Sequence, residues 1–430
     1  MRAASAGWLV RVVAVCAWLA TVFATSSRAD EHSVDPQQME VPPEMPRVDV
    51  PVPGQGKRSI IPVPEVITSP TEGVTGGMLG VVLFANPDKS IHSIFAPDLR
   101  WNSITGFWPT VRYLGFPDPK QKYTLIAGKA TKRGDFFDGD YSGEDLFDGR
   151  VDLRLNARRD QDPFERFFGF GNDTSDSDET NYTGTVHRVI AFAGYNLLDT
   201  LQASLQLRWN HVRIGHGGVS SVENLRDSPL ANTKGVDGAS IVATRFGLTY
   251  DSRDLSDIPT EGYFADASFE VADKVLGSTH GFQRYGLEGK GFVPLRRDRR
   301  VIFAAHVGLD YMSNGGSAPF YERNTVGGIH SLRGYGRNRF TDKHRVVMQY
   351  ELRTNVYDRE LFGVKTHIEV APFVDLSKVF NDAGDFWLVH LHPVGGVGFR
   401  GVVVPQVVAY VDVGTSGDSA AVFTGIDYPF

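Results

Sequence analysis

The chain has 430 residues, a formal net charge of −7 and a single cysteine, Cys16. This excess of acid argues against a nucleic-acid binder, which normally shows a basic surface. Because Cys16 lies in the leader described next, the rest of the chain can form no disulfide framework, thiolate metal site or cysteine nucleophile.

Residues 1–29 have the pattern of a secretory signal peptide. Arg2 and Arg11 supply the positive region, and the apolar run from Val12 to Ala24 is too short to span a bilayer comfortably. Small residues at Ser27 and Ala29 suit a signal peptidase. We predict export with cleavage of this segment; an uncleaved anchor is the alternative.

Residues 30–73 form a proline-rich segment with nine prolines between positions 36 and 70. Proline fixes φ and cannot donate to a sheet, so this stretch is predicted to be extended or disordered. Its Val-Pro repeats suit a polyproline II conformation. We interpret it as a periplasmic linker, and docking on a partner domain is the alternative.

Residues 74–430 alternate between apolar and polar side chains with a period of two. Such alternation predicts strands with one apolar and one wet face. We count about sixteen segments of roughly 10–14 residues, long enough for tilted strands that cross a bilayer and longer than most strands of soluble sandwiches. A typical segment alternates the apolar Leu201, Ala203, Leu205, Leu207 and Trp209 with the polar Gln202, Ser204, Gln206, Arg208 and Asn210.

The predicted fold is therefore all-β: a closed transmembrane antiparallel barrel of about sixteen strands, residues 74–430, with its apolar face toward lipid. A soluble sandwich would turn that face inward. Long connections at Asp160–Glu179, Gly215–Gly238 and Ser313–Lys343 alternate with short turns, as expected for an outer-membrane barrel. Gly134–Phe147 is the exception, because we expect it to form a long acidic turn at the short-turn end.

The chain ends in an aromatic residue, Phe430, with Tyr428 two positions before it. Ile426, Thr424 and Val422 share their parity. A terminal aromatic on an alternating strand resembles the C-terminal assembly signal of bacterial outer-membrane barrels, and we assign that role to Tyr428 and Phe430.

One long loop carries the segment Gly327-Gly328-Ile329-His330-Ser331-Leu332-Arg333-Gly334-Tyr335. It resembles the loop-six signature of the BamA/TamA barrel superfamily, also called bacterial surface antigens. We call residues 314–343 loop six. Three further segments resemble family motifs in the same order: Phe167–Asn172, Asp251–Gly262 and Phe373–Ser377, the last with Ser377 in place of the family's Gly.

In the family, loop six folds into the lumen and its Arg pairs with acids on the wall. The resemblance thus implies a lock made of Arg333, Gly334, Tyr335, Glu351 and Asp375. Alternation alone predicts that Glu351 and Asp375 point inward, because each shares a face with other polar residues of its strand. An arginine fork can clamp two carboxylates. The alternative is an ordinary surface loop with a solvated Arg333.

The resemblance implies a function in inserting or translocating proteins or lipids at the outer membrane. Members with that function carry POTRA modules before the barrel, and the proline-rich segment is too short for one, so we expect a POTRA-less branch. The alternatives are a passive or gated pore, or an anchor for a periplasmic or surface partner such as a lipase. We expect no catalytic residues, cofactor, metal or nucleic acid. The expected partners are outer-membrane lipid, client barrel proteins or lipids, and a periplasmic protein on the linker.

Overall fold

The computed structural model describes residues 60–86, 91–118, 120–361, 364–403, 407–416, 420–426 and 428–430. The predicted signal peptide, residues 1–29, and residues 30–59 of the predicted linker lie outside the described residues. None of the helices in the described part is long and apolar enough to cross a membrane.

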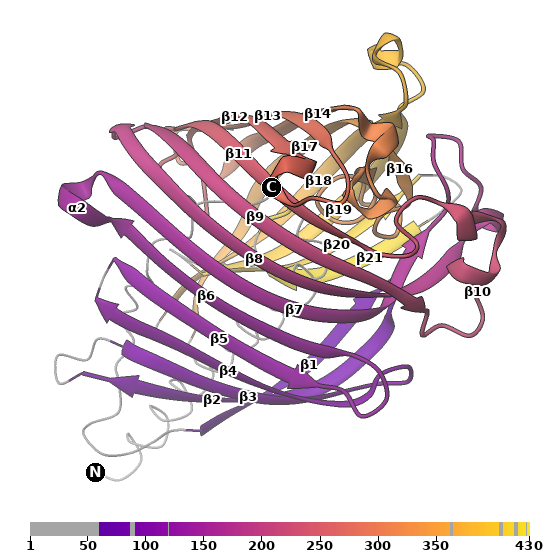
Figure 1. The fold of residues 1–430 in the computed structure, drawn as a ribbon. Helices are drawn as coiled ribbons and strands as arrows, with labels where there is room; N and C mark the ends of the chain where they lie inside the picture. Colours follow the sequence, from indigo (N-terminus) through magenta and orange to yellow (C-terminus); the bar gives the residue numbers. More distant parts are fainter. Residues whose placement is uncertain are drawn as a thin grey trace, which may run out of the picture.

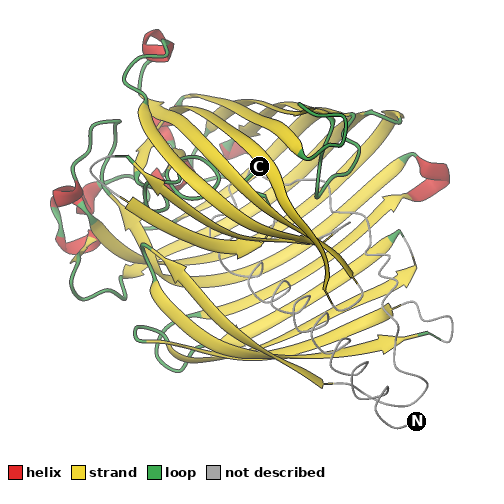
Figure 2. Ribbon diagram, turned by 180° about the vertical axis from the view of Figure 1, so that it is seen from behind, coloured by secondary structure: helices red, strands yellow, loops and turns green. Residues whose placement is uncertain are grey.

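One sheet of nineteen strands forms the body of the molecule. Eighteen of them pair antiparallel with their neighbours in chain order and wrap around an interior as a tilted barrel (Figures 1 and 2), which confirms the predicted fold. The nineteenth, β10 (Glu223–Asn224), adds in parallel to β8. The barrel strands are β1 (Ile60–Ser69), β2 (Gly73–Ala85), β3 (Ile91–Asn102), β4 (Gly106–Asp118), β5 (Gln121–Lys129), β6 (Asp135–Asp145), β7 (Val151–Phe167), β8 (Thr180–Leu198), β9 (Leu201–His216), β11 (Ala239–Asp251), β12 (Gly262–Ala272), β13 (Phe282–Pro294), β14 (Val301–Ser313), β17 (His344–Leu361), β18 (Val364–Phe380), β19 (His392–Val403), β20 (Val407–Thr415) and β21 (Ala420–Ile426).

The barrel is polar inside and apolar outside. On β9, Gln206, Arg208 and Asn210 are buried, whereas Leu207 and Trp209 between them are 52% and 40% exposed. On β17, Gln349, Glu351 and Arg353 are likewise buried, whereas Leu352 between the last two is 37% exposed. A soluble sandwich would bury the apolar face, so this burial pattern excludes it and suits a wall surrounded by lipid.

Two segments that the sequence analysis assigned elsewhere are strands, which is why the barrel has eighteen strands and not sixteen. β1 lies within the predicted linker and pairs with β2 along its whole length. Its prolines, Pro62 and Pro64, stand two residues apart and so lack their N–H on the same side. Sheets tolerate this at an edge strand. The segment 134–147, predicted to be an acidic turn, is mostly β6, which pairs with β5 and β7.

The first and last strands, β1 and β21, lie next to each other. Among the described residues, however, β1 forms a ladder only with β2 and β21 only with β20. The barrel therefore has a seam that is not closed by a described ladder. Because the number of strands is even, both ends of the barrel chain lie at the same end of the barrel.

The three longest connections, residues 168–179, 217–238 and 314–343, lie at one end of the barrel, opposite the two-residue turn at 199–200. Loop six is the largest and contains a small antiparallel pair, β15 (Asn324–Val326) and β16 (Phe340–Asp342). The remaining elements are short: α2 (Leu146–Gly149) and the 3₁₀ turns η2 (Asp176–Asp178), η3 (Leu225–Asp227), η4 (Pro229–Asn232), η5 (Lys274–Leu276), η6 (Gly315–Ser317), η7 (Phe320–Glu322) and η8 (Ala383–Phe386).

Candidate functional site in the lumen

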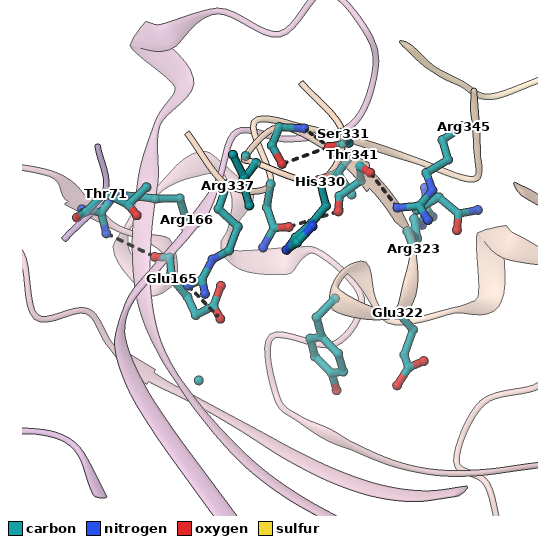
Figure 3. Close-up of a pocket in the computed structure, with 18 of the residues that line it drawn as sticks. Thr71, Glu165, Arg166, Glu322, Arg323, His330, Ser331, Arg337, Thr341 and Arg345 are labelled. Atoms are coloured by element: carbon teal, nitrogen blue, oxygen red, sulfur yellow. Dashed lines mark hydrogen bonds and ion pairs between the residues drawn. The ribbon is translucent and has the colours of Figure 1, made fainter. Parts of the chain in front are cut away.

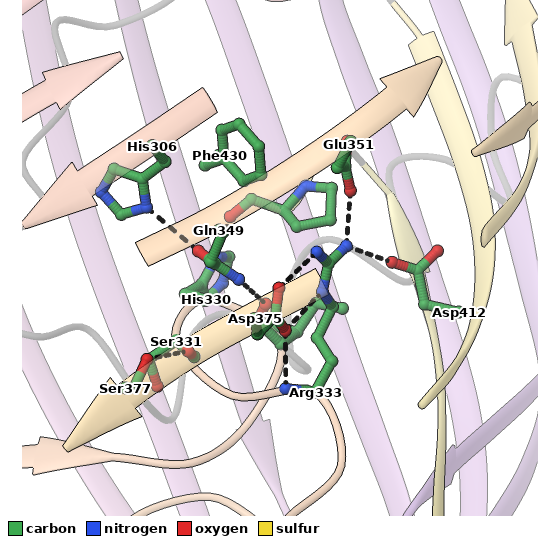
Figure 4. Close-up of polar contacts among 12 residues, drawn as sticks. His306, His330, Ser331, Arg333, Gln349, Glu351, Asp375, Ser377, Asp412 and Phe430 are labelled. Atoms are coloured by element: carbon green, nitrogen blue, oxygen red, sulfur yellow. Dashed lines mark hydrogen bonds and ion pairs between the residues drawn. The ribbon is translucent and has the colours of Figure 1, made fainter. Parts of the chain in front are cut away.

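Loop six folds back into the barrel, and Arg333 lies at the centre of its contacts with the wall (Figure 4). The Arg333 side chain is fully buried. Its Nη1 donates to Glu351 Oε1 at 2.5 Å, while Nε and Nη2 donate to the two oxygens of Asp375 at 2.9 and 2.7 Å. The backbone N–H of Arg333 also donates to Asp375, at 3.0 Å. The guanidinium lies 3.6 Å over the ring of Phe373.

Three further charged residues complete this cluster. Arg333 Nη1 also donates to Asp412 on β20 at 2.9 Å. Arg400 on β19 donates to both oxygens of Glu351, at 2.9 and 2.6 Å, and Arg353 donates to Glu351 at 2.9 Å. Three arginines thus face three carboxylates in a buried volume. This balance of charge makes burial tolerable, because the desolvation of each unpaired ion would cost roughly several kcal/mol of stability.

Glycines allow loop six to approach the wall closely. A Cβ at Gly414 on β20 would lie 2.4 Å from the backbone oxygen of Arg333, and a Cβ at Gly334 would lie 2.8 Å from Val394. Tyr335 packs edge-on against Phe340 with ring centroids 5.3 Å apart. These contacts fix the loop backbone around the Arg333 side chain.

Ser377, the residue that departs from the family motif, also contacts loop six. Its hydroxyl donates to the backbone oxygen of Ser331 at 2.7 Å, and the Ser377 side chain is buried. A glycine there would provide space but no donor. Serine in place of the family's glycine at position 377 therefore fills this space and adds a hydrogen bond between β18 and loop six.

A second charged cluster, which the sequence analysis did not identify, anchors the beginning of loop six. Glu322 in η7 receives two bonds from Arg208 on β9, both at 3.0 Å, and one from Asn210 at 3.2 Å. Arg284 on β13 donates to the Glu322 backbone oxygen. Glu270 on β12 accepts from both arginines, at 3.0 and 2.9 Å. Here the loop supplies the acid and the wall supplies the cations.

A polar cavity of about 280 Å³ remains beside loop six (Figure 3). Loop six also contacts the wall across this cavity, because Arg337 pairs with Asp162 and Glu165 on β7, at 2.8 and 3.4 Å. The loop therefore spans the lumen from β7 and β9 on one side to β18 and β20 on the other.

The end of the chain also enters the lumen, which differs from the strand expected for Tyr428 and Phe430. β21 ends at Ile426, and Pro429, which has no N–H, cannot continue a ladder. The Tyr428 hydroxyl donates to Glu369 at 2.8 Å, and the Arg353 guanidinium lies 3.6 Å over the Tyr428 ring.

Phe430 itself packs inside the barrel. It stacks on His306, with ring centroids 5.4 Å apart, and its backbone oxygen accepts from Arg353 at 3.2 Å. His330 of loop six hydrogen-bonds the Pro429 oxygen at 2.9 Å. The last three residues thus connect loop six to the inner wall, and the assembly role assigned to Tyr428 and Phe430 stays a prediction.

The structure brings the five residues of the predicted lock together, and their functional role stays a prediction. Sequence reasoning did not include Arg353, Arg400, Asp412 or Glu322 in the site, although it placed Arg353 on the same inward face as Glu351. Alternation could also have placed Arg400 and Asp412 on inner faces, since Asp412 stands between Val411 and Val413. No sequence signal marks Glu322, because it lies in a loop without periodicity.

Comparison with known proteins agrees with this architecture. Residues 125–386 match the Omp85 superfamily domain. The fold is similar to a structure of BamA from Haemophilus ducreyi lacking POTRA domains 1–3, with 15% identity and a TM-score of 0.53, covering 86% of this chain and 75% of that one. A weaker likeness is to CdiB from Escherichia coli, with 12% identity and a TM-score of 0.43, covering 87% of this chain and 68% of that one.

Proposed function

We propose a function on this premise: the chain belongs to the Omp85 superfamily, and its barrel lies in the bacterial outer membrane. The function is to assist insertion or translocation of proteins or lipids at that membrane, after export and cleavage of residues 1–29. Client barrel proteins or lipids are its partners, and residues 30–59 are the place where a periplasmic protein binds.

The observation that carries this proposal is the buried cluster around Arg333. It holds loop six across the lumen, so the axis of the barrel is obstructed in this state. A barrel built for free diffusion would leave its axis open. An obstructed axis favours a function in which clients are inserted or translocated at the barrel wall. The residues that keep the axis obstructed are then Arg333, Gly334, Tyr335, Glu351 and Asp375.

The seam between β1 and β21 is the part of the wall suited to insertion or translocation of clients. Pro62 and Pro64 remove two backbone donors from β1. Because both lie in a ladder with β2, the side on which they lack donors is best placed toward β21. Fewer hydrogen bonds lower the cost of parting these two strands, and a client strand can pair with the backbone groups that are exposed.

Depletion of the protein followed by proteomics of the outer membrane tests the proposal. We expect specific barrel proteins or lipids to fall in the outer membrane and their precursors to rise in the periplasm. Complementation with wild type restores them, and a variant lacking Pro62 and Pro64 (both changed to Val) restores them poorly. An unchanged outer-membrane composition contradicts the proposal.

A gated pore is the second candidate, favoured by the polar cavity beside loop six. It predicts solute flux without any change in membrane composition. Flux in liposomes that contain only this protein, together with an unchanged proteome on depletion, would select the pore.

A further inference from the structure

A row of polar side chains crosses the outer face of the barrel near its loop end. Arg159 on β7 stands opposite His187 on β8, and His187 stands opposite His211 on β9. Val189 and Trp209 share this face, two residues nearer the membrane centre, and are 47% and 40% exposed. The row therefore lies at the edge of the apolar belt that faces lipid.

The charge of this row comes from its arginines. Arg159 Nη1 hydrogen-bonds His187 Nε2 at 2.9 Å, and Arg213 Nε donates to His211 Nε2 at 3.2 Å. Arginine can only donate, so the Nε2 atom of each ring is the acceptor. His211 Nδ1 is bound to Ser240 at 2.7 Å. The histidines thus orient the two arginine side chains.

We define the cationic rim as Lys129, Asp135, Arg159, His187, His211, Arg213 and Ser240. Its single acid, Asp135, is occupied by two bonds from Arg159, at 2.7 and 2.9 Å. Lys129 stands opposite Asp135 in the register without an ion pair among the described contacts. The two terminal nitrogens of Arg213, an exposed residue, have no partner among these contacts either. Two cations are therefore available to a ligand.

The surface below these cations is suited to an acyl chain. A shallow groove on the outer wall is lined by Ala127 and Phe137 and bordered by Lys129 and Arg159. Phe137 is 41% exposed. An amphipathic ligand can place its chain along the apolar belt and its headgroup at the cationic rim.

We propose that the cationic rim binds the phosphate groups of a glycolipid in the membrane leaflet at the loop end of the barrel. Loops of outer-membrane barrels lie outside the cell, so this is the outer leaflet. Lys129 on β5 and Arg213 on β9 are four strand spacings apart, roughly 19 Å. One phosphate cannot contact both residues, whereas a lipid with two phosphates on a disaccharide can contact cations at both ends. This site does not depend on the insertion or pore function proposed above.

Binding of lipid A, a diphosphorylated disaccharide lipid, to the purified mature chain in detergent tests the proposal. We expect the double variant Lys129→Gln, Arg213→Gln to bind about tenfold more weakly, which corresponds to about 1.4 kcal/mol. Monophosphoryl lipid A should bind wild type with intermediate affinity, and high salt should weaken all binding because these charges are exposed. Arg296→Gln, an exposed arginine at the opposite rim, is the matched control and should bind like wild type.

Heat-modifiable migration in gels confirms that each variant is folded before binding is measured. Single cysteines at Ser177 and Thr200 check the orientation, because only the first, on a long loop, should react with a reagent added to intact cells. Equal binding by wild type and the double variant overturns the proposal. So does equal loss with Arg296→Gln, or binding of phosphatidylglycerol as tight as that of lipid A.

Discussion

Two points along loop six, Glu322 near its beginning and Arg333 near its middle, are fixed by charged clusters of opposite polarity. At Arg333 the loop supplies the cation and the wall supplies the acids, whereas at Glu322 the loop supplies the acid and the wall supplies the arginines. Both clusters are buried and nearly balanced in charge. In both clusters the wall also supplies the other sign: Arg353 and Arg400 pair with Glu351, and Glu270 pairs with Arg208 and Arg284.

The two clusters differ in which partners the wall residues keep when the charged residue of loop six is removed. All hydrogen bonds to the Asp375 side chain in the described part of the chain come from Arg333. Arg208 and Arg284, in contrast, both keep Glu270 if Glu322 is lost. The wall around Arg333 therefore depends on the loop, while the wall around Glu322 is partly paired without it.

The first prediction concerns Arg333→Ala, which leaves Asp375 buried without a partner. Removing one member of a buried pair costs roughly 3–5 kcal/mol. We expect this loss in the free energy of unfolding measured with guanidinium in detergent, and protease cleavage of loop six in intact cells. Arg333→Lys should rescue poorly, since one ammonium cannot bind two carboxylates in a fork. Wild-type stability of Arg333→Ala would mean that water already solvates the cluster.

The second prediction concerns Glu322→Gln, which keeps the side-chain volume and removes the charge. Because Glu270 still pairs Arg208 and Arg284, the loss should be smaller, about 1.5–3 kcal/mol, the range of a hydrogen bond to a charged group. The same unfolding assay measures it. A loss larger than that of Arg333→Ala would reverse the order of the two anchors.

The third prediction concerns Phe430, at the end of the chain, which contacts Arg353 of the cluster around Arg333. Deleting Phe430 removes a partly buried ring packed against Phe292, Ile302 and Ala304. Full burial of such a ring is worth about 1.5–3 kcal/mol, so we expect about half of that. We also expect less folded barrel in the membrane and more degradation in the periplasm. Unchanged amounts of heat-modifiable barrel would reduce Phe430 to an incidental terminus.

The fourth and smallest effect is expected for Ser377→Ala, which removes one hydrogen bond to loop six. Its cost should be about 0.5–1.5 kcal/mol. Ser221→Ala, at an exposed position in a long loop, is the matched control. If Ser377→Gly is as stable as wild type, the space at this position matters and the hydroxyl does not.

Much of the fold could be predicted from the sequence because alternation is a local property. It identified strands such as β9 and the inward parity of Glu351 and Asp375. It missed β1 and β6, since prolines and an Asp-Gly-Asp run suggest linkers and turns unless a paired neighbour supports the strand. Pairing is a property of the whole barrel, which a short window does not contain.

The candidate site was predictable where a strand parity or a motif marked it. Arg333 lies in a motif, and the parity of its acids follows from their strands. Asp412 and Arg400 become partners only when β19 and β20 curve next to β18. Glu322 meets Arg208 across more than a hundred residues of chain, a contact that no local pattern encodes.

The number of strands determines how wide the lumen is that loop six and its two charged clusters have to occlude. Open barrels of sixteen to eighteen strands enclose a water-filled channel. In this chain, loop six and the residues 428–430 occupy that space. The impermeability of the envelope at this point is thus not a property of the wall. We infer that it is set by the free energy of a few buried ion pairs, and we expect cells that lose these pairs to become sensitive to bulky antibiotics and detergents that the outer membrane normally keeps out.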